Sequence, residues 1–131
     1  MIDRVANVEI RNGAVCDFGS FGILGNGSDG HWSNRIIGIR SVRNGATGIW
    51  LNGKGNVIRN CTSSYNNSDG IFSGDYAAYI GNTTIYNGRY GINVSGHSIL
   101  DQNISKSNSQ VYAGYPNIDS CDNCNFGTNA D

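Results

Sequence analysis

The feature that most constrains the fold of this 131-residue chain is an internal repeat of about 21 residues. Four asparagines, Asn44, Asn66, Asn87 and Asn108, follow one another at intervals of 22, 21 and 21 residues. The first three are each followed, five residues later, by the isoleucine of a Gly-Ile pair, and an apolar residue stands eight residues before every one of the four. Such a period is typical of chains that stack copies of one small structural unit, each of which buries its apolar face against the next.

The composition of the repeat indicates strands rather than helices. Gly, Asn and Ser interrupt the stretches between the repeated asparagines before three helical turns could form. Leucine occurs only at Leu24, Leu51 and Leu100, which is too few for a leucine-rich repeat. The remaining runs are short and rich in Ile, Val and Tyr, as strands are. One coil of about 22 residues fits three short strands and three turns, stacked on the next coil at ~4.8 Å.

The sequence therefore predicts an all-β solenoid of about five to six coils, in a single domain that spans residues 1–131. The expected coils are listed by residue number, and the last range is a C-terminal closing segment. They are 5–31, 32–55, 56–77, 78–96, 97–116 and 117–131.

Two consecutive segments of the repeat, VIRNCTSSYNNSDGIFSG and YIGNTTIYNGRYGINVSG, resemble the right-handed parallel β-helix of the pectin-lyase-like superfamily. That superfamily includes pectate lyases, polygalacturonases, mannuronan epimerases, phage tailspikes and NosD-type proteins. The resemblance covers nearly the whole chain and implies a right-handed parallel β-helix. Members with activity usually have more coils and a capping helix, neither of which is visible here, and no motif of a lyase, hydrolase or epimerase is present.

Charge and hydropathy exclude several classes of function. Nine basic and ten acidic residues give a formal net charge of −1. The chain therefore lacks the positive electrostatic potential that attracts a phosphate backbone, and we expect no nucleic-acid partner. No apolar run approaches the roughly 18–20 residues of a membrane span, so we expect no membrane partner. The first residues do not form a signal peptide. We expect an extracellular or particle-surface location, with any export signal outside this sequence.

Alternation within the Gly-Ile strands predicts which side chains face in and which face out. The isoleucine column should form the core. The outward column should stack on successive coils, and it consists of Leu24, Trp50, Phe72, Asn93 and Tyr112.

The outward column suggests a polysaccharide-binding surface. Exposed aromatic side chains along a sheet can pack on the C–H faces of sugar rings, and nearby amides can bond sugar hydroxyls. We therefore predict ligand-binding roles for Trp50, Phe72, Asn93, Tyr112 and, beside them, Asn52. The alternative is that another copy of the chain covers this face, because large exposed apolar patches usually mark an interface.

A row of ionisable side chains is expected just beyond the same strands, at Lys54, Asp75 and His97. An amine, a carboxylate and an imidazole within a few coils could carry out proton transfer or glycosyl chemistry. These residues are therefore candidate catalytic groups of a small polysaccharide-modifying enzyme. The alternative is that they are unrelated turn charges in solvent.

The remaining polar residues have structural interpretations. The repeated asparagines should hydrogen-bond between coils inside the solenoid. Cys16 and Cys61 fall two coils apart, too far for a disulfide, whereas Cys121 and Cys124 could be free, paired or metal-bound. We expect no metal and no cofactor. Because end coils expose unpaired backbone and apolar interior, we also expect a homo-oligomer or a larger assembly. A structural solenoid without a ligand is the third alternative, beside the binding module and the enzyme.

Overall fold

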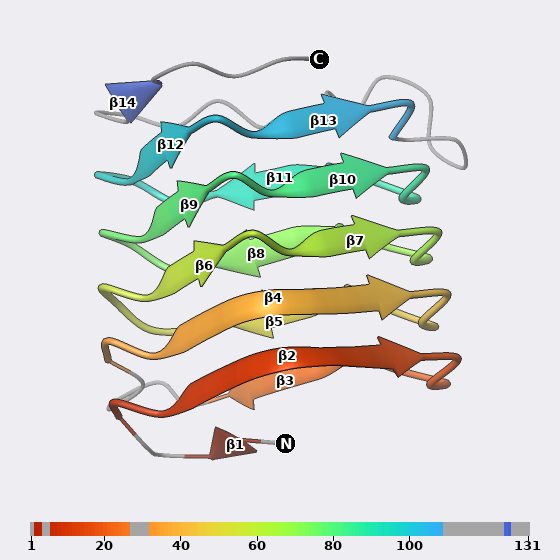
Figure 1. Cartoon of the computed structure of the whole chain (residues 1–131), viewed down its shortest axis with the longest axis horizontal. Coiled ribbons are helices and arrows are strands. Elements are labelled where there is room, and N and C mark those ends of the chain that lie inside the picture. The colour runs from red at the N-terminus through yellow and green to blue at the C-terminus, as the bar shows by residue number, and fades with distance from the viewer. Residues whose placement is uncertain (1, 4–5, 27–31, 109–124, 127–131) are drawn as a thin grey trace.

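The computed structural model of the protein describes residues 2–3, 6–26, 32–108 and 125–126, which form two parallel β-sheets (Figure 1). Sheet A contains β1 (Ile2–Asp3), β3 (Ile23–Asn26), β5 (Ile49–Leu51), β8 (Ile71–Ser73) and β11 (Ile92–Val94). Sheet B contains β2 (Glu9–Cys16), β4 (Arg35–Val42), β6 (Val57–Arg59), β7 (Thr62–Ser64), β9 (Ala78–Ile80), β10 (Thr83–Ile85), β12 (Ile99–Asp101), β13 (Ile104–Lys106) and β14 (Asn125–Phe126).

The two sheets are opposite sides of one parallel β-solenoid, which confirms the predicted fold class. In Figure 1 the chain runs from left to right along the near side, returns behind it and rises by one level, so the solenoid is right-handed. The described residues complete about four turns, close to the five to six coils expected. Of the predicted closing segment 117–131, only β14 belongs to the described residues, and it pairs with β12.

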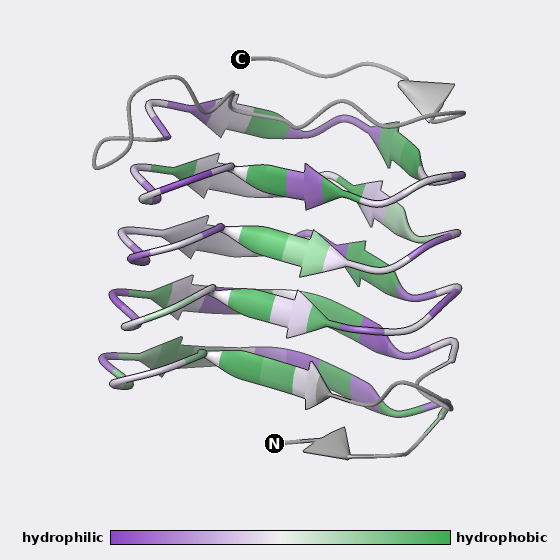
Figure 2. Ribbon diagram, turned by 180° about the vertical axis from the view of Figure 1, so that it is seen from behind, coloured by the Kyte–Doolittle hydropathy of each residue, from purple (hydrophilic) through white to green (hydrophobic). Residues whose placement is uncertain are grey.

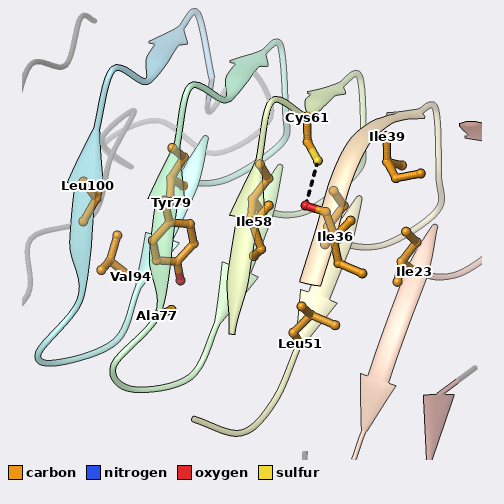
Figure 3. Close-up of a cluster of buried hydrophobic side chains, with 13 residues drawn as sticks. Ile23, Ile36, Ile39, Leu51, Ile58, Cys61, Ala77, Tyr79, Val94 and Leu100 are labelled. Carbon is orange, nitrogen blue, oxygen red and sulfur yellow. Dashed lines mark hydrogen bonds between the residues drawn. The ribbon is translucent and has the colours of Figure 1, made fainter. Parts of the chain in front are cut away.

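The predicted registers are confirmed on both sides of the core. In sheet A, Ile23, Ile49, Ile71 and Ile92 pair in one buried column. In sheet B, the apolar residues eight positions before the repeated asparagines form the opposing column, and Ile10 extends it by pairing with Ile36. The members are Ile10, Ile36, Ile58, Tyr79 and Leu100. Figure 3 shows members of both columns, among them Ile23, Ile58 and Leu100, in the interior. Burial of each aliphatic side chain contributes about 1.5–3 kcal/mol.

The chain turns at three corners per coil, and a residue with left-handed backbone stands at each corner. Corner 1 joins sheet A to sheet B, corner 2 bends sheet B, and corner 3 joins sheet B back to sheet A. Corner 1 consists of Asn7, Ser33, Gly55, Tyr76 and His97. Corner 2 consists of Asn12, Gly38, Asn60, Gly81 and Gln102. Corner 3 consists of Asp17, Arg43, Tyr65, Tyr86 and Ser107.

Each corner reverses the direction of the backbone hydrogen bonds between coils. At corner 3, the N–H of Arg43 bonds forward to Ser64, whereas the N–H of Gly45 bonds back to Phe18. The N–H of Asn44, which lies between them, instead donates to the Oδ1 of Asn66 on the next coil, at 3.0 Å. A buried N–H without an acceptor is costly, so a polar side chain is required at this point of every coil.

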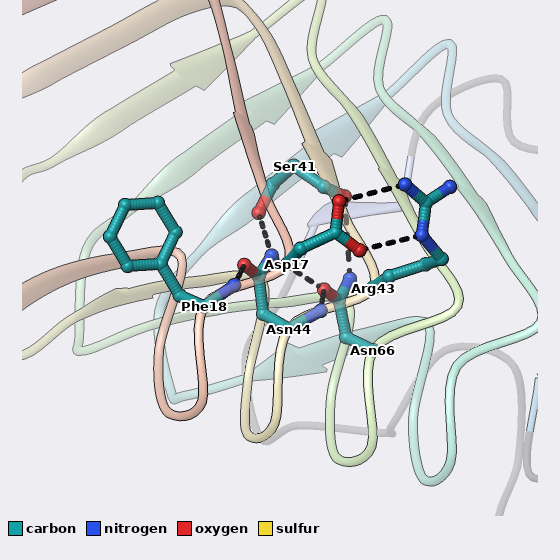
Figure 4. A network of polar contacts seen from close by, with 6 residues as sticks. All are labelled: Asp17, Phe18, Ser41, Arg43, Asn44 and Asn66. Carbon is teal, nitrogen blue, oxygen red and sulfur yellow. Dashed lines mark hydrogen bonds and ion pairs between the residues drawn. The ribbon is translucent and has the colours of Figure 1, made fainter.

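The asparagine ladder, defined as Asn44, Asn66, Asn87 and Asn108, supplies these acceptors (Figure 4). Each member is buried, and the side-chain amides of the first three also donate to the Oδ1 of the next member, at 2.8–2.9 Å. Asn82 and Asn103 do the same at corner 2. The prediction that the repeated asparagines are structural is therefore confirmed.

The glycine of the Gly-Ile pairs is required because the interior is narrow beside corner 3. A Cβ on Gly70 would lie 2.7 Å from the Nδ2 of Asn87 and 2.5 Å from the carbonyl oxygen of Gly91. Gly22 and Gly48 are similarly close to the asparagine ladder and to a serine of the facing strand. The repeat therefore keeps glycine where the two sheets come closest.

Tyr79 shows how one coil compensates for a larger side chain. It takes the place of Ile58 and Leu100 in the sheet B column and is fully buried. Its hydroxyl accepts a hydrogen bond from the N–H of Ser73 at 2.8 Å, and the Asn93 carbonyl lies 3.3 Å away. Ser73 stands where the neighbouring coils have Leu51 and Val94, so a small residue makes room for the ring. Burial raises the pKa of Tyr79, which keeps the hydroxyl protonated.

The two described cysteines are free thiols, as expected. Cys61 is buried, and its sulfur lies 3.5 Å from the carbonyl oxygen of Ile36. Burial raises the pKa of this thiol, which makes it a poor nucleophile. Cys16 is half-buried. Cys121 and Cys124 lie outside the described residues, so their predicted alternatives stay open.

Replacing Asn66 by alanine should strongly destabilise the protein. The change removes the acceptor for both the backbone N–H and the side-chain amide of Asn44, at 3.0 and 2.9 Å. Each buried donor left without a partner costs about 1–3 kcal/mol. The free energy of unfolding, measured by chemical denaturation, should fall accordingly.

The matched control is Asn67→Ala, because Asn67 is the next residue but is exposed and bonds through its backbone N–H. This variant should unfold at nearly the same denaturant concentration as the unchanged protein. Equal losses in the two variants would contradict the role given to the ladder.

Gly70→Ala should also lower the free energy of unfolding, by about 1–3 kcal/mol, because its Cβ overpacks the narrow interior. Gly19→Ala is the control, since a Cβ at Gly19 meets no atom within 4 Å. Thermal unfolding followed by circular dichroism compares the two. A Gly70→Ala variant as stable as the Gly19→Ala variant would show that the interior can widen.

Candidate functional site

The outer face of sheet A carries the column that the sequence predicted. Parallel pairing aligns Leu24 with Trp50, Trp50 with Phe72, and Phe72 with Asn93. We call these four residues the outer ladder. Tyr112, the fifth predicted member, lies outside the described residues. Figure 2 shows this face, where β11 has a hydrophilic band between two hydrophobic ones, at Asn93.

The rings of the outer ladder form a tilted stack. The ring centroids of Trp50 and Phe72 are 4.3 Å apart, with 39° between the ring planes. Phe21 packs edge-on against Trp50, at 5.6 Å and 69°. All three side chains are half-buried, so the surface is less exposed than the sequence suggested. The indole N–H of Trp50 has no acceptor among the described residues and remains available to a ligand.

A polar cluster ends the aromatic part of the outer ladder. The carboxylate of Asp69 is completely buried, accepts a hydrogen bond from the side-chain amide of Asn93 at 3.0 Å, and accepts another from the N–H of Tyr90 at 3.2 Å. The guanidinium of Arg89 lies 3.7 Å from the same carboxylate and over the ring of Tyr90.

This cluster fixes how Asn93 presents its amide. An ionised carboxylate can only accept hydrogen bonds, so the NH₂ group of Asn93 must face Asp69. The Oδ1 atom then faces away from that carboxylate and accepts no hydrogen bond from a described residue. Beside Phe72, the site therefore offers an oriented acceptor next to a ring.

Glycines separate the outer ladder from corner 1. Gly74 follows β8 directly, and a Cβ on it would collide with the carbonyl oxygen of Gly53 on the preceding coil. Backbone therefore packs on backbone between the two rows of large side chains. Asn52 follows β5 directly, next to this strip, and is half-buried.

The ionisable residues predicted at corner 1 come from consecutive coils, but an aromatic ring lies among them. His97 stacks on Tyr76, with ring centroids 4.9 Å apart and 17° between the planes. The amine of Lys54, from the coil before Tyr76, lies 5.9 Å from the centroid of the same ring. Corner 1 thus brings Lys54 and His97 together through Tyr76 rather than by direct contact. Asp75 precedes Tyr76 and is half-buried.

A second exposed row of aromatic residues therefore lies beside the half-buried ladder. Trp32 pairs with Lys54 through a parallel bridge, and Trp32 and Tyr76 are each 55% exposed. Gly55 occupies the corner position before Tyr76, so no side chain from that position covers the ring. Trp32, Lys54, Tyr76 and His97 form what we call the corner row.

The sequence did not identify Phe21, Asp69, Arg89 or the stacking role of Tyr76. Asp69 and Arg89 belong to turns, where charged residues usually face solvent, and no periodicity marks them as partners. Asp69 and Tyr90 each directly precede a Gly-Ile pair, so the repeat could have placed them in one column. The repeat could not show that Asp69 is buried. Among the described residues, no group of three or more His, Cys, Asp or Glu side chains is placed to hold a metal ion.

Comparison with known proteins does not add a family to this description. No protein-family profile, curated protein or solved structure matches the chain. In the part of the chain that the structure describes, no helix is long and apolar enough to cross a membrane.

Proposed function

We propose that the outer face of sheet A, together with the corner row, binds a polysaccharide. The observation that carries this proposal is the pair of aromatic rows on successive coils, Trp50 with Phe72 and Tyr76 with His97, on either side of a glycine strip. The proposal includes an extracellular or particle-surface setting and membership of the pectin-lyase-like superfamily, which the solenoid architecture supports.

The chemistry of the two rows suits sugar rings. Aromatic rings offer apolar faces for the C–H side of a pyranose, and polar groups nearby fix its orientation. The indole N–H of Trp50 can donate to a sugar hydroxyl, and the Oδ1 of Asn93 can accept from one. Because successive coils lie ~4.8 Å apart, a chain that runs along the solenoid axis meets these groups one after another.

The charge of the face is nearly balanced, which favours recognition by stacking and hydroxyl contacts. Arg89 is paired with Asp69, and Lys54 lies against the Tyr76 ring on the coil next to Asp75. No strong field of one sign is present to select a polyanion such as a nucleic acid.

Trp50→Ala should abolish retention of the protein by its polysaccharide, because it removes the ring that contacts both Phe21 and Phe72. Affinity electrophoresis through gels that contain neutral or acidic soluble polysaccharides measures this directly. The unchanged protein should be retarded by at least one polysaccharide, and Trp50→Ala should migrate as in an empty gel. Circular dichroism checks that the variant is folded.

The control is Thr62→Ala, an exposed position on the outer face of sheet B, which should be retarded like the unchanged protein. Equal retardation of Trp50→Ala would rule out the outer ladder as the binding surface. A change in sedimentation of Trp50→Ala, without any retardation of the unchanged protein, would indicate instead that another copy covers this face.

Catalysis on the bound polysaccharide is a second candidate function, favoured by the position of Lys54, Asp75 and His97 on consecutive coils at one corner. Asp75→Asn should then stop the release of new reducing ends or unsaturated products, and it should leave retardation in gels unchanged. If the unchanged protein releases no product from any polysaccharide that retards it, the face binds without catalysis.

A further inference from the structure

The backbone conformation of two tyrosines points to a second binding surface. Tyr65 and Tyr86 stand at corner 3 with φ of 56° and 57°. Left-handed backbone is unfavourable for bulky side chains, and such residues concentrate where function requires them. At corner 2, the described residues with the same conformation are Asn, Gly or Gln. The chain therefore uses well-suited residues at one corner and tolerates tyrosines at another.

The two tyrosine rings form exposed steps. Their centroids are 5.1 Å apart, with 30° between the planes. The rings are therefore tilted against each other rather than stacked face to face. The two side chains are 54% and 37% exposed. Ser107, which follows Tyr86 in the column, is too small to cover its ring.

The polar groups beside the rings are the two tyrosine hydroxyls and the guanidinium of Arg43, which is paired with a carboxylate. Neither tyrosine hydroxyl forms a hydrogen bond with any described residue. Arg43, which precedes Tyr65 in the corner 3 column, is held by Asp17 through two hydrogen bonds of 2.7 and 2.8 Å (Figure 4). This pairing also holds the pKa of Asp17 below its usual value. Lys106, on the coil after Tyr86, is exposed, so the surroundings carry one positive charge beside the paired Arg43 and Asp17.

Two positions after corner 3, the chain carries few side chains. The residues two positions after the corner are Gly19, Gly45, Asn67 and Gly88, which stack directly by backbone contact. Only Asn67 adds a side chain there, and it is exposed.

We propose that Tyr65 and Tyr86 form a second carbohydrate-binding platform, separate from the outer ladder. The tilted rings would stack on the apolar face of a pyranose, and the two tyrosine hydroxyls and the Asn67 amide would bond its hydroxyl groups. The platform lies at corner 3, where sheet B leads into sheet A, whereas the outer ladder lies on the strands of sheet A. Trp50 is not part of the Tyr65–Tyr86 platform, which adds to the retention given by the outer ladder and does not replace it.

The test replaces both tyrosines by asparagine, a residue that this chain already accepts in the same conformation at Asn12 and Asn60. Tyr65→Asn/Tyr86→Asn should therefore keep the unfolding temperature of the unchanged protein. The probe is the same panel of neutral and acidic soluble polysaccharides in affinity gels. Retardation should drop at least several-fold in the double variant, and the corner 2 variant Asn60→Gly should be retarded normally.

Several outcomes would overturn the proposal, and they differ from those that concern Trp50. Unchanged retardation of the double variant, with retardation lost in Trp50→Ala, rejects the tyrosine platform alone. A fall of several degrees in unfolding temperature shows that the stack serves stability instead. A change of oligomeric state in sedimentation shows a contact between copies. If no polysaccharide retards the unchanged protein, both platforms are rejected.

Discussion

The N–H group that follows each left-handed corner is the constraint on which the rest of this solenoid depends. Backbone hydrogen bonds run forward to the next coil before a corner and back to the preceding coil after it. The group between them cannot be satisfied by either neighbour's backbone. At corner 3 the Oδ1 of Asn66 satisfies Asn44, and at corner 1 the hydroxyl of Ser98 satisfies Ala77. The interior must therefore hold a polar side chain at a fixed place in successive coils.

That requirement controls the shape of the core. The asparagine ladder and the facing serines fill the interior near corner 3, and they leave no space for a Cβ on Gly48 or Gly70. Apolar bulk is confined to the middle of the cross-section. There, the exchange of size between Tyr79 and Ser73 keeps both volume and hydrogen bonding in balance. The Gly-Ile pair and the repeated asparagine are thus two consequences of one packing problem.

The architecture could be predicted from the sequence because these interior requirements recur at a fixed period. The spacing of Asn44 and Asn66, and of Ile49 and Ile71, sets the register that the strands show. The described residues complete about four turns, close to the five to six coils expected. The positions of the left-handed corners, and with them the reversal of hydrogen bonding, could not be predicted from residue type. Tyr, Arg and His occupy corner positions as well as Asn and Gly.

The candidate site was predicted only in part, for a related reason. Strand alternation placed Trp50 and Phe72 side by side, since register alone decides that contact. Burial was misjudged, because the edge-on contact of Phe21 with Trp50 comes from a turn outside the alternating pattern. The Asp69–Asn93 bond links a turn to a strand one coil later, and only the path of the turn brings them together.

The division between interior and exterior explains why function is best sought on the outward side chains, both on sheet A and at the corners. Side chains that point inward are tied to the hydrogen-bond reversal and to a narrow core, so they have little freedom to vary. A left-handed corner residue, by contrast, points outward, and its identity affects stability mainly through its own backbone preference. Corner 2 follows that preference with Asn, Gly and Gln. Corners 1 and 3 depart from it with stacked rings at Tyr76 and Tyr65. A departure that folding does not require, repeated on adjacent coils and left exposed, is best explained by contacts with another molecule.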